Sequence, residues 1–192
     1  MTLNKSILRI ALVTAFLLLI PLVAMQFNTG VTWTLFDFVV AGTLLFGTGL
    51  TYTLVAGKWN NTTYRMAVGV AVLAGLLLVW AQLAVGLVGS EDNPVNLLFG
   101  AVLLVAIIGA IVARFRPRGM SNAMFAASLT YVVATIIAVF IWLPSPATAE
   151  PQVGLVNVLG ANMVFAALWA VSGWLFRRAS TAGSTQNGQL AS

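Results

Sequence analysis

Six long apolar segments, separated by short polar ones, are the feature of this sequence that most limits how it can fold. A helix needs about 20 mostly apolar residues to cross the hydrocarbon core of a bilayer. The segments that meet this requirement are residues 7–27, 33–56, 66–88, 95–113, 123–143 and 153–176. The sequence therefore predicts an all-α fold, a bundle of six transmembrane helices joined by short loops.

The composition favours a membrane protein over a soluble one. Only 7% of the residues are charged, whereas a soluble domain has roughly 25%, and the mean hydropathy is +1.01. A chain of 192 residues has no room for a soluble domain beside six spans. We therefore expect one membrane domain over residues 1–178. Residues 179–192 have neither charge nor an apolar pattern, so we expect a disordered tail.

The charged residues predict the orientation of the spans. With six spans, every Lys and Arg falls on one side of the membrane and every acidic residue on the other. Basic residues are enriched in cytoplasmic loops, so we expect both termini and the tail to be cytoplasmic. The basic residues are Lys5, Arg9, Lys58, Arg65, Arg114, Arg116, Arg118, Arg177 and Arg178, and the acids are Asp37, Glu91, Asp92 and Glu150.

Several kinds of chemistry are excluded by the residue types. The chain has no cysteine and no histidine, which excludes disulfides, thiol chemistry and histidine-ligated metal or haem. It has no phosphate-binding loop, dinucleotide fingerprint, nucleophile elbow or zinc motif. We therefore expect no catalysis and no cofactor. The net charge of +5 is explained by membrane topology and does not predict a nucleic-acid partner.

The turn between spans 3 and 4 is the most polar stretch of the apolar region. Asn93 can cap the fourth span with Pro94 at its first helical position, and Glu91 and Asp92 precede that positive helix end. This structural interpretation, without a metal, is the one we prefer. The alternative is an external site for a cation or a partner, because carboxylate and amide oxygens bind hard cations. Its residues would be Asp37, Glu91, Asp92, Asn93 and Asn96.

A few polar residues lie within the spans themselves. Asp37 is the one acid inside an apolar segment, and it either has a function or reaches the headgroup region. The other candidate intramembrane contacts are Thr48, Gln82, Asn157 and Asn162. We interpret them as interhelical hydrogen bonds or packing contacts, and the Gly- and Thr-rich face of span 2 as a close-packing surface. A polar path through the membrane is the alternative.

The cluster of Arg114, Arg116 and Arg118 beside Pro117 follows span 4. Basic residues at a membrane surface set topology and attract anionic lipid headgroups. We expect both roles here.

A weak internal repeat relates three polar residues. A shift of 59 residues aligns Asp37 with Asn96, and a further shift of 61 aligns Asn96 with Asn157. A direct repeat of helical hairpins would place a pseudo-symmetry axis along the membrane normal. The alternative is chance matching in a chain rich in Leu, Val and Ala.

The stretch Ala84–Gly100, followed by the basic turn from Ala113 to Met120, resembles a group of small uncharacterised bacterial inner-membrane proteins with several spans. The resemblance is best over spans 3 to 5. It implies a multi-pass protein of the bacterial cytoplasmic membrane, and it implies no activity and no site residues.

Two classes of function agree with these observations. The first is a non-enzymatic accessory or scaffolding subunit that binds lipids and other membrane proteins, or further copies of itself. The second is a small, oligomeric permease or channel for a small solute or cation, lined by spans 2, 3 and 6. We prefer the first, because a transport site would leave a stronger polar signature near the middle of the membrane.

Overall fold

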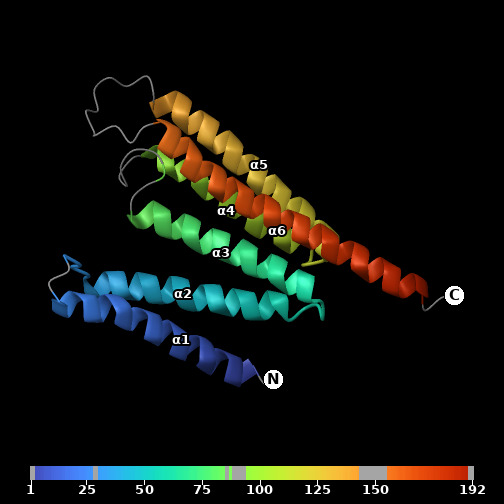
Figure 1. Cartoon of the computed structure of the whole chain (residues 1–192), viewed down its shortest axis with the longest axis horizontal. Coiled ribbons are helices and arrows are strands. Elements are labelled where there is room, and N and C mark those ends of the chain that lie inside the picture. Colours follow the sequence, from blue (N-terminus) through green and yellow to red (C-terminus); the bar gives the residue numbers. More distant parts are fainter. Residues whose placement is uncertain (1–2, 28–29, 85–86, 88–93, 143–154, 190–192) are drawn as a thin grey trace. The chain divides into compact units, whose positions relative to one another are not determined.

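The computed structural model describes residues 3–27, 30–84, 87, 94–142 and 155–189, and for residues 3, 142, 155–157 and 182–189 it describes the backbone alone. Every regular element among these residues is a helix (Figure 1). In chain order they are α1 (Leu3–Ala24), η1 (Met25–Phe27), α2 (Leu35–Ala56), α3 (Thr62–Ala84), η2 (Pro94–Phe99), α4 (Gly100–Val112), α5 (Pro117–Trp142) and α6 (Leu155–Gln189).

The expectation of six apolar helices of membrane-spanning length is confirmed among the described residues. The described residues contain six helices that are long and apolar enough to cross a membrane, and each corresponds to one of the predicted segments. These helices are Asn4–Phe27, Leu35–Ala56, Thr62–Ala84, Pro94–Val112, Pro117–Ile141 and Val158–Thr181. The fold is therefore all-helical and has the architecture of a multi-pass membrane protein.

Two helix boundaries differ from those expected. The fourth span begins as the 3₁₀ helix η2, and its α-helical part starts only at Gly100. The sixth helix continues through Gln189, although composition predicts a disordered tail from residue 179. No proline interrupts this segment, and the hydroxyls of Ser180 and Thr181 donate to the carbonyls of Arg177 and Arg178 at 2.7 and 2.9 Å. Such local bonds satisfy polar side chains within a continuing helix.

The contacts divide the chain into two compact units, an N-terminal unit of residues 1–57 and a C-terminal unit of residues 58–192. The single membrane domain over residues 1–178 stays a prediction. In the N-terminal unit, α1 and α2 approach closely at Gly49, where an added Cβ would lie 2.7 Å from Cγ2 of Ile10. This glycine of α2 therefore packs against a helix, which agrees with the packing interpretation of the Gly-rich face.

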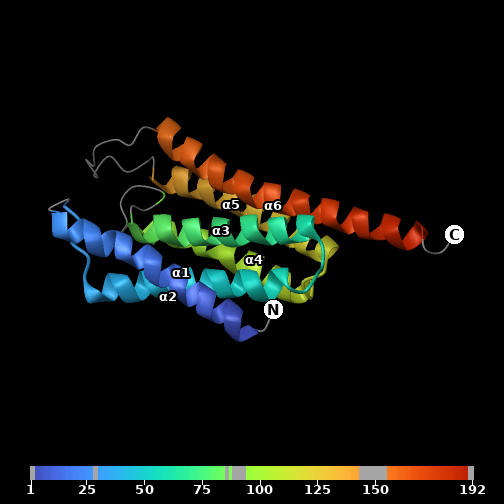
Figure 2. The same cartoon turned by 60° about the horizontal axis from the view of Figure 1, so that its bottom comes forward.

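In the C-terminal unit, α6 packs along α5 and α3, and α4 packs along α5 (Figure 2). Small residues allow the close approaches, because a Cβ on Gly109 of α4 would lie 2.6 Å from Cβ of Ala123 on α5. Hydroxyls join the helices as well. Ser172 of α6 donates to the Ala67 carbonyl of α3 at 2.9 Å. Packing of small residues and hydroxyl contacts are the usual means by which helices associate in lipid.

Candidate functional site

A buried polar cluster joins three parts of the C-terminal unit around Asn162 of α6. The Tyr131 hydroxyl of α5 donates to Oδ1 of Asn162 at 2.9 Å. The Asn162 amide donates to the carbonyl of Val158 in its own helix at 2.8 Å and to the carbonyl of Leu87 at 3.3 Å. Asn162 is 1% exposed and Tyr131 is fully buried. Asn162 of α6 therefore forms an interhelical contact with α5 and also binds Leu87, which follows α3 in the chain.

The backbone of Leu87 also forms a hydrogen bond with Asn96 of η2. The N–H of Leu87 donates to Oδ1 of Asn96 at 3.1 Å, and the Gln82 side-chain amide of α3 donates to the Asn96 carbonyl at 2.9 Å. Side-chain hydrogen bonds to a backbone carbonyl compete with the regular backbone bonds of a helix. The Asn96 carbonyl, which accepts from Gln82, lies in the 3₁₀ helix η2, and the α-helix begins only at Gly100.

Aromatic rings surround this cluster, which we call the asparagine cluster (Gln82, Leu87, Asn96, Tyr131 and Asn162). The Tyr131 ring lies against Phe99 with centroids 5.0 Å apart, and it stacks on Phe165 at 5.8 Å. Phe99 is fully buried. Asn96, Tyr131 and Asn162 are buried, and an unpaired polar group costs much more in such surroundings than it does in water. The cluster has the chemistry of a structural tie between helices.

Asp37 lies in the N-terminal unit and caps its own helix. Its carboxylate accepts from the N–H and the hydroxyl of Thr34 at 2.7 and 2.8 Å, and the Asp37 N–H donates to the Thr34 hydroxyl at 3.4 Å. This is a capping box, which satisfies backbone N–H groups left open at the start of α2. The contacts give Asp37 a local structural role.

The other candidate residues, those of the external site and those within the spans, are only partly within the described chain. Glu91, Asp92 and Asn93 of the external site lie outside the described residues, as does the side chain of Asn157, a candidate intramembrane contact. Asn96 is buried in the asparagine cluster. Thr48 is half-buried on α2. A cation site at the acidic turn stays a prediction, and so does the internal repeat.

A second cluster lies at the basic end of the C-terminal unit, around the backbone carbonyl of Phe115. This carbonyl accepts from the Trp59 indole N–H at 3.0 Å and from the Tyr64 hydroxyl at 2.8 Å. The Tyr64 ring packs edge-on against Phe176 of α6 at 5.2 Å. Nζ of Lys58 lies 4.8 Å from the centroid of the Phe115 ring. Three segments that are distant in the sequence therefore meet at one point.

The turn that presents the Phe115 carbonyl has an uncommon backbone conformation. Arg114 and Phe115 have φ values of +49° and +57°. The Arg114 N–H donates to Ile111 at 2.9 Å and the Phe115 N–H donates to Ala110 at 3.1 Å, the pattern of a Schellman motif at the end of α4. Glycine usually occupies the left-handed position of this motif. The two side-chain hydrogen bonds to Phe115 help to hold a conformation that non-glycine residues adopt at a cost.

Two tyrosines and one tryptophan that organise the two clusters are not among the site residues expected from the sequence. Tyr131, Tyr64 and Trp59 lie in or next to apolar segments, where their rings are also typical of residues that pack or lie at a span end. A signal was present, because a tyrosine hydroxyl in the middle of a span must find a partner in the absence of water.

Two buried polar atoms have no hydrogen-bond partner within the described chain, Oγ of Ser121 and Nε1 of Trp169.

Comparison with known proteins adds no relative to this description. No protein-family model, no curated protein sequence and no solved structure matches the chain.

Proposed function

We propose that the chain is a non-enzymatic accessory or scaffolding subunit of the bacterial cytoplasmic membrane, which binds other membrane proteins laterally through its spans. Its six apolar helices are compatible with an integral membrane protein. The positive-inside rule favours an orientation with both termini in the cytoplasm. The choice of the bacterial cytoplasmic membrane is part of the proposal and follows from the resemblance expected for residues 84–120.

The observation that carries this proposal is the use of the polar side chains in the C-terminal unit. Gln82, Asn96 and Asn162 each donate to or accept from the backbone of another segment. Ser128 and Ser172 donate to carbonyls of neighbouring helices at 2.9 Å. Polar groups that hold helices together in this way are not directed at a passing solute. The arrangement supports a rigid packed unit more than a permeation path.

The polar side chains are used within the unit, so the surface that can bind another membrane protein is the outer, apolar face of the helices. Large apolar side chains are exposed along every span, for example Phe16 of α1, Phe36 of α2, Ile111 of α4 and Phe140 of α5. Lipid tails cover such side chains in a bilayer, and another membrane helix can do so equally well, because association in lipid depends on shape and packing more than on hydrophobicity.

The test is site-specific photocrosslinking in membranes. A diazirine amino acid would replace Phe16, Phe36, Ile111 or Phe140 in turn, so that both units are probed on exposed positions. We expect at least one position to give a protein adduct of one defined mass, either a partner or a second copy of the chain. The positions that do not face a partner would give lipid adducts, and they serve as controls for each other.

The permease alternative predicts a different outcome. In that case any protein adduct would be to a second copy of the chain, because the permease is expected to be oligomeric, and proteoliposomes would show a solute flux that depends on the polar residues of the spans. A flux reduced by Thr48→Val or Gln82→Leu, together with an absence of adducts to any other protein, would refute the accessory role.

A further inference from the structure

We propose that the basic end of the C-terminal unit is a binding surface for the headgroups of anionic phospholipids. Seven basic residues carry this surface, which we call the basic collar, and all seven are exposed. They are Lys58, Arg65, Arg114, Arg116, Arg118, Arg177 and Arg178. The inference rests on membrane insertion of the helices, and it does not require a protein partner.

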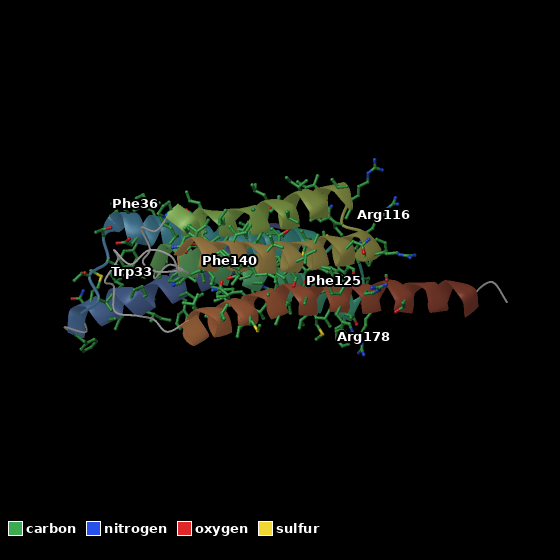
Figure 3. The ribbon with its side chains drawn as sticks, turned by 90° about the horizontal axis from the view of Figure 1, so that it is seen from above. Trp33, Phe36, Arg116, Phe125, Phe140 and Arg178 are labelled. Atoms are coloured by element: carbon green, nitrogen blue, oxygen red, sulfur yellow. The ribbon has the colours of Figure 1, made fainter. Side chains whose placement is uncertain are left out.

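The contacts of the fold bring the collar together from three separate segments. Trp59 and Tyr64 bind the carbonyl of Phe115, which joins the start of α3 to the turn between α4 and α5. The ring contact between Tyr64 and Phe176 adds α6. Basic residues flank each of these anchors in the sequence. Figure 3 shows Arg116 and Arg178 toward the same end of the unit.

The described part of the chain pairs no carboxylate with the collar. None of its seven cations forms an ion pair in the described part of the chain. The acids of this unit are Glu91, Asp92 and Glu150, and they follow the far ends of α3 and α5 in the sequence rather than the ends next to the collar. A cluster of like charges repels itself unless anions from outside approach it. The positive charge of the collar therefore favours the binding of an anionic ligand.

The position of the collar at the ends of the spans indicates that the anionic ligand is a lipid headgroup. Lys58, Arg114 and Arg116 lie just outside the membrane-spanning helices, whose ends here are Thr62, Val112 and Pro117. Charged side chains at this level reach the phosphates of the headgroup layer, and each adds to attraction toward an anionic membrane surface. The phosphodiester of an anionic lipid is thus the ligand that lies within reach.

Exposed tryptophans mark the same depth. Trp59 is 42% exposed and Trp174 is 46% exposed, and indole rings prefer the boundary between hydrocarbon and water. The Arg178 guanidinium lies 3.7 Å from the centroid of the Trp174 ring, and Lys58 lies over Phe115. Cation–π contacts of this kind position the charge beside a ring at the interface. Two of the seven cations are therefore held in place before a lipid arrives.

The turn between α4 and α5 is preorganised as well. The three consecutive N–H groups of residues 114–116 all donate to backbone carbonyls, so they are not available to an anion. Recognition must come from the side chains, which extend from a turn whose backbone is hydrogen-bonded. A backbone that is already ordered has a lower ordering cost on binding. The collar should therefore select lipids by net charge and phosphate, and zwitterionic lipids should bind it less well, because their amine offsets the phosphate.

The experiment is native mass spectrometry of the purified full-length chain in detergent, titrated with phosphatidylglycerol or with phosphatidylcholine of the same acyl chains. We expect a clear preference for phosphatidylglycerol. The double variant Lys58→Gln/Arg116→Gln should lower the ratio of phosphatidylglycerol binding to phosphatidylcholine binding about 25-fold. Each charge near the membrane surface contributes about fivefold to this ratio, and the variant removes two charges. The preference should also fall as salt concentration rises.

Two control variants make the result specific. Lys5→Gln/Arg9→Gln removes the same amount of charge from the N-terminal unit, and it should leave most of the preference in place. Lys58→Arg/Arg116→Lys keeps the charges and should retain the preference. Melting temperatures in phosphatidylcholine would show that each variant is folded.

Three results would overturn the proposal. They are equal binding of the two lipids by the unchanged chain, an unchanged preference in the Lys58→Gln/Arg116→Gln variant, and an equal loss in the Lys5→Gln/Arg9→Gln control. These measurements use the isolated chain with no partner protein. Failure of the accessory role in the crosslinking test would therefore leave them unaffected, and the two proposals can fail separately.

Discussion

The hydrogen bond between Tyr131 and Asn162 gives the sharpest test of how the C-terminal unit is held together. Tyr131→Phe removes only the hydroxyl and leaves the ring on Phe99 and Phe165. Oδ1 of Asn162 then loses the one hydroxyl that it accepts from in the described chain. We expect the free energy of unfolding to fall by about 1–2 kcal/mol, because interhelical hydrogen bonds in membranes contribute about 0.6–1.7 kcal/mol and a buried unpaired acceptor costs about 1–3 kcal/mol.

Asn162→Ala should have a larger effect than Tyr131→Phe. It removes the bond to Tyr131 and also the amide that donates to the Leu87 carbonyl. The loss should be about 3 kcal/mol, from one bond between helices, one bond to the backbone of Leu87 and the buried groups that they leave unpaired. The double variant should lose less than the sum of the two single variants, by about 1 kcal/mol, because both remove the same bond.

The assay is reversible unfolding of the purified protein in mixed micelles with increasing SDS, or steric trapping in bicelles. Tyr52→Phe is the matched control, because it makes the same chemical change on a tyrosine that is 40% exposed on α2. We expect that control to change stability by less than about 0.5 kcal/mol. Equal effects of the two Tyr→Phe variants, or no coupling in the double-mutant cycle, would show that the asparagine cluster does not stabilise the fold.

Three further predictions follow from the backbone and from the charge pattern. Arg114→Gly should raise the free energy of unfolding by about 0.5–1 kcal/mol, because glycine adopts positive φ without strain, and a lower stability in an SDS titration would contradict this. Gly109→Ala should destabilise the unit by about 1–3 kcal/mol through the clash with Ala123, whereas Gly160→Ala, where the added Cβ meets nothing within 4 Å, should be neutral or stabilising; equal effects in a melting assay would count against close packing of α4 and α5. A reporter fused after Ser192 should be active in the cytoplasm, and activity only outside it would invalidate the predicted orientation.

The number and approximate position of the helices could be predicted from the sequence because apolar length is a local property. The sequence also predicts interhelical contacts for Gln82 and Asn162, since an amide within an apolar segment has few other uses, and in the structure these side chains form hydrogen bonds with Asn96 and Tyr131. Their partners could not be predicted. Leu87 and Asn162 are 75 positions apart, and the acceptor is a backbone carbonyl, which has no sequence signature.

The asparagine after the acidic turn shows a second limit of the sequence. The sequence predicts that Asn96 lies near the same membrane surface as Asp37 and the acidic residues, in one candidate external site. The structure buries Asn96 against Leu87 instead. Whether a polar residue near a span end faces water or a neighbouring backbone depends on how the turn folds, and composition does not contain that information.

The basic turn shows a third limit. An arginine and a phenylalanine occupy the left-handed positions where a glycine would be expected, and Gly119 lies several residues later. The sequence therefore gave no local indication of a Schellman motif. The conformation is supported by Trp59 and Tyr64 from another loop, which is a tertiary effect.

The position of Asn162 in the final helix has a consequence for how the protein is made. Ribosomes deliver α3, η2 and α5 before α6, so the Leu87 carbonyl and the Tyr131 hydroxyl wait for their partner until the last span is synthesised. Ser172 likewise reaches α3 only at that stage. A chain that ends after α5 would therefore lack the groups that bind the Tyr131 hydroxyl and the carbonyls of Leu87 and Ala67 in the structure.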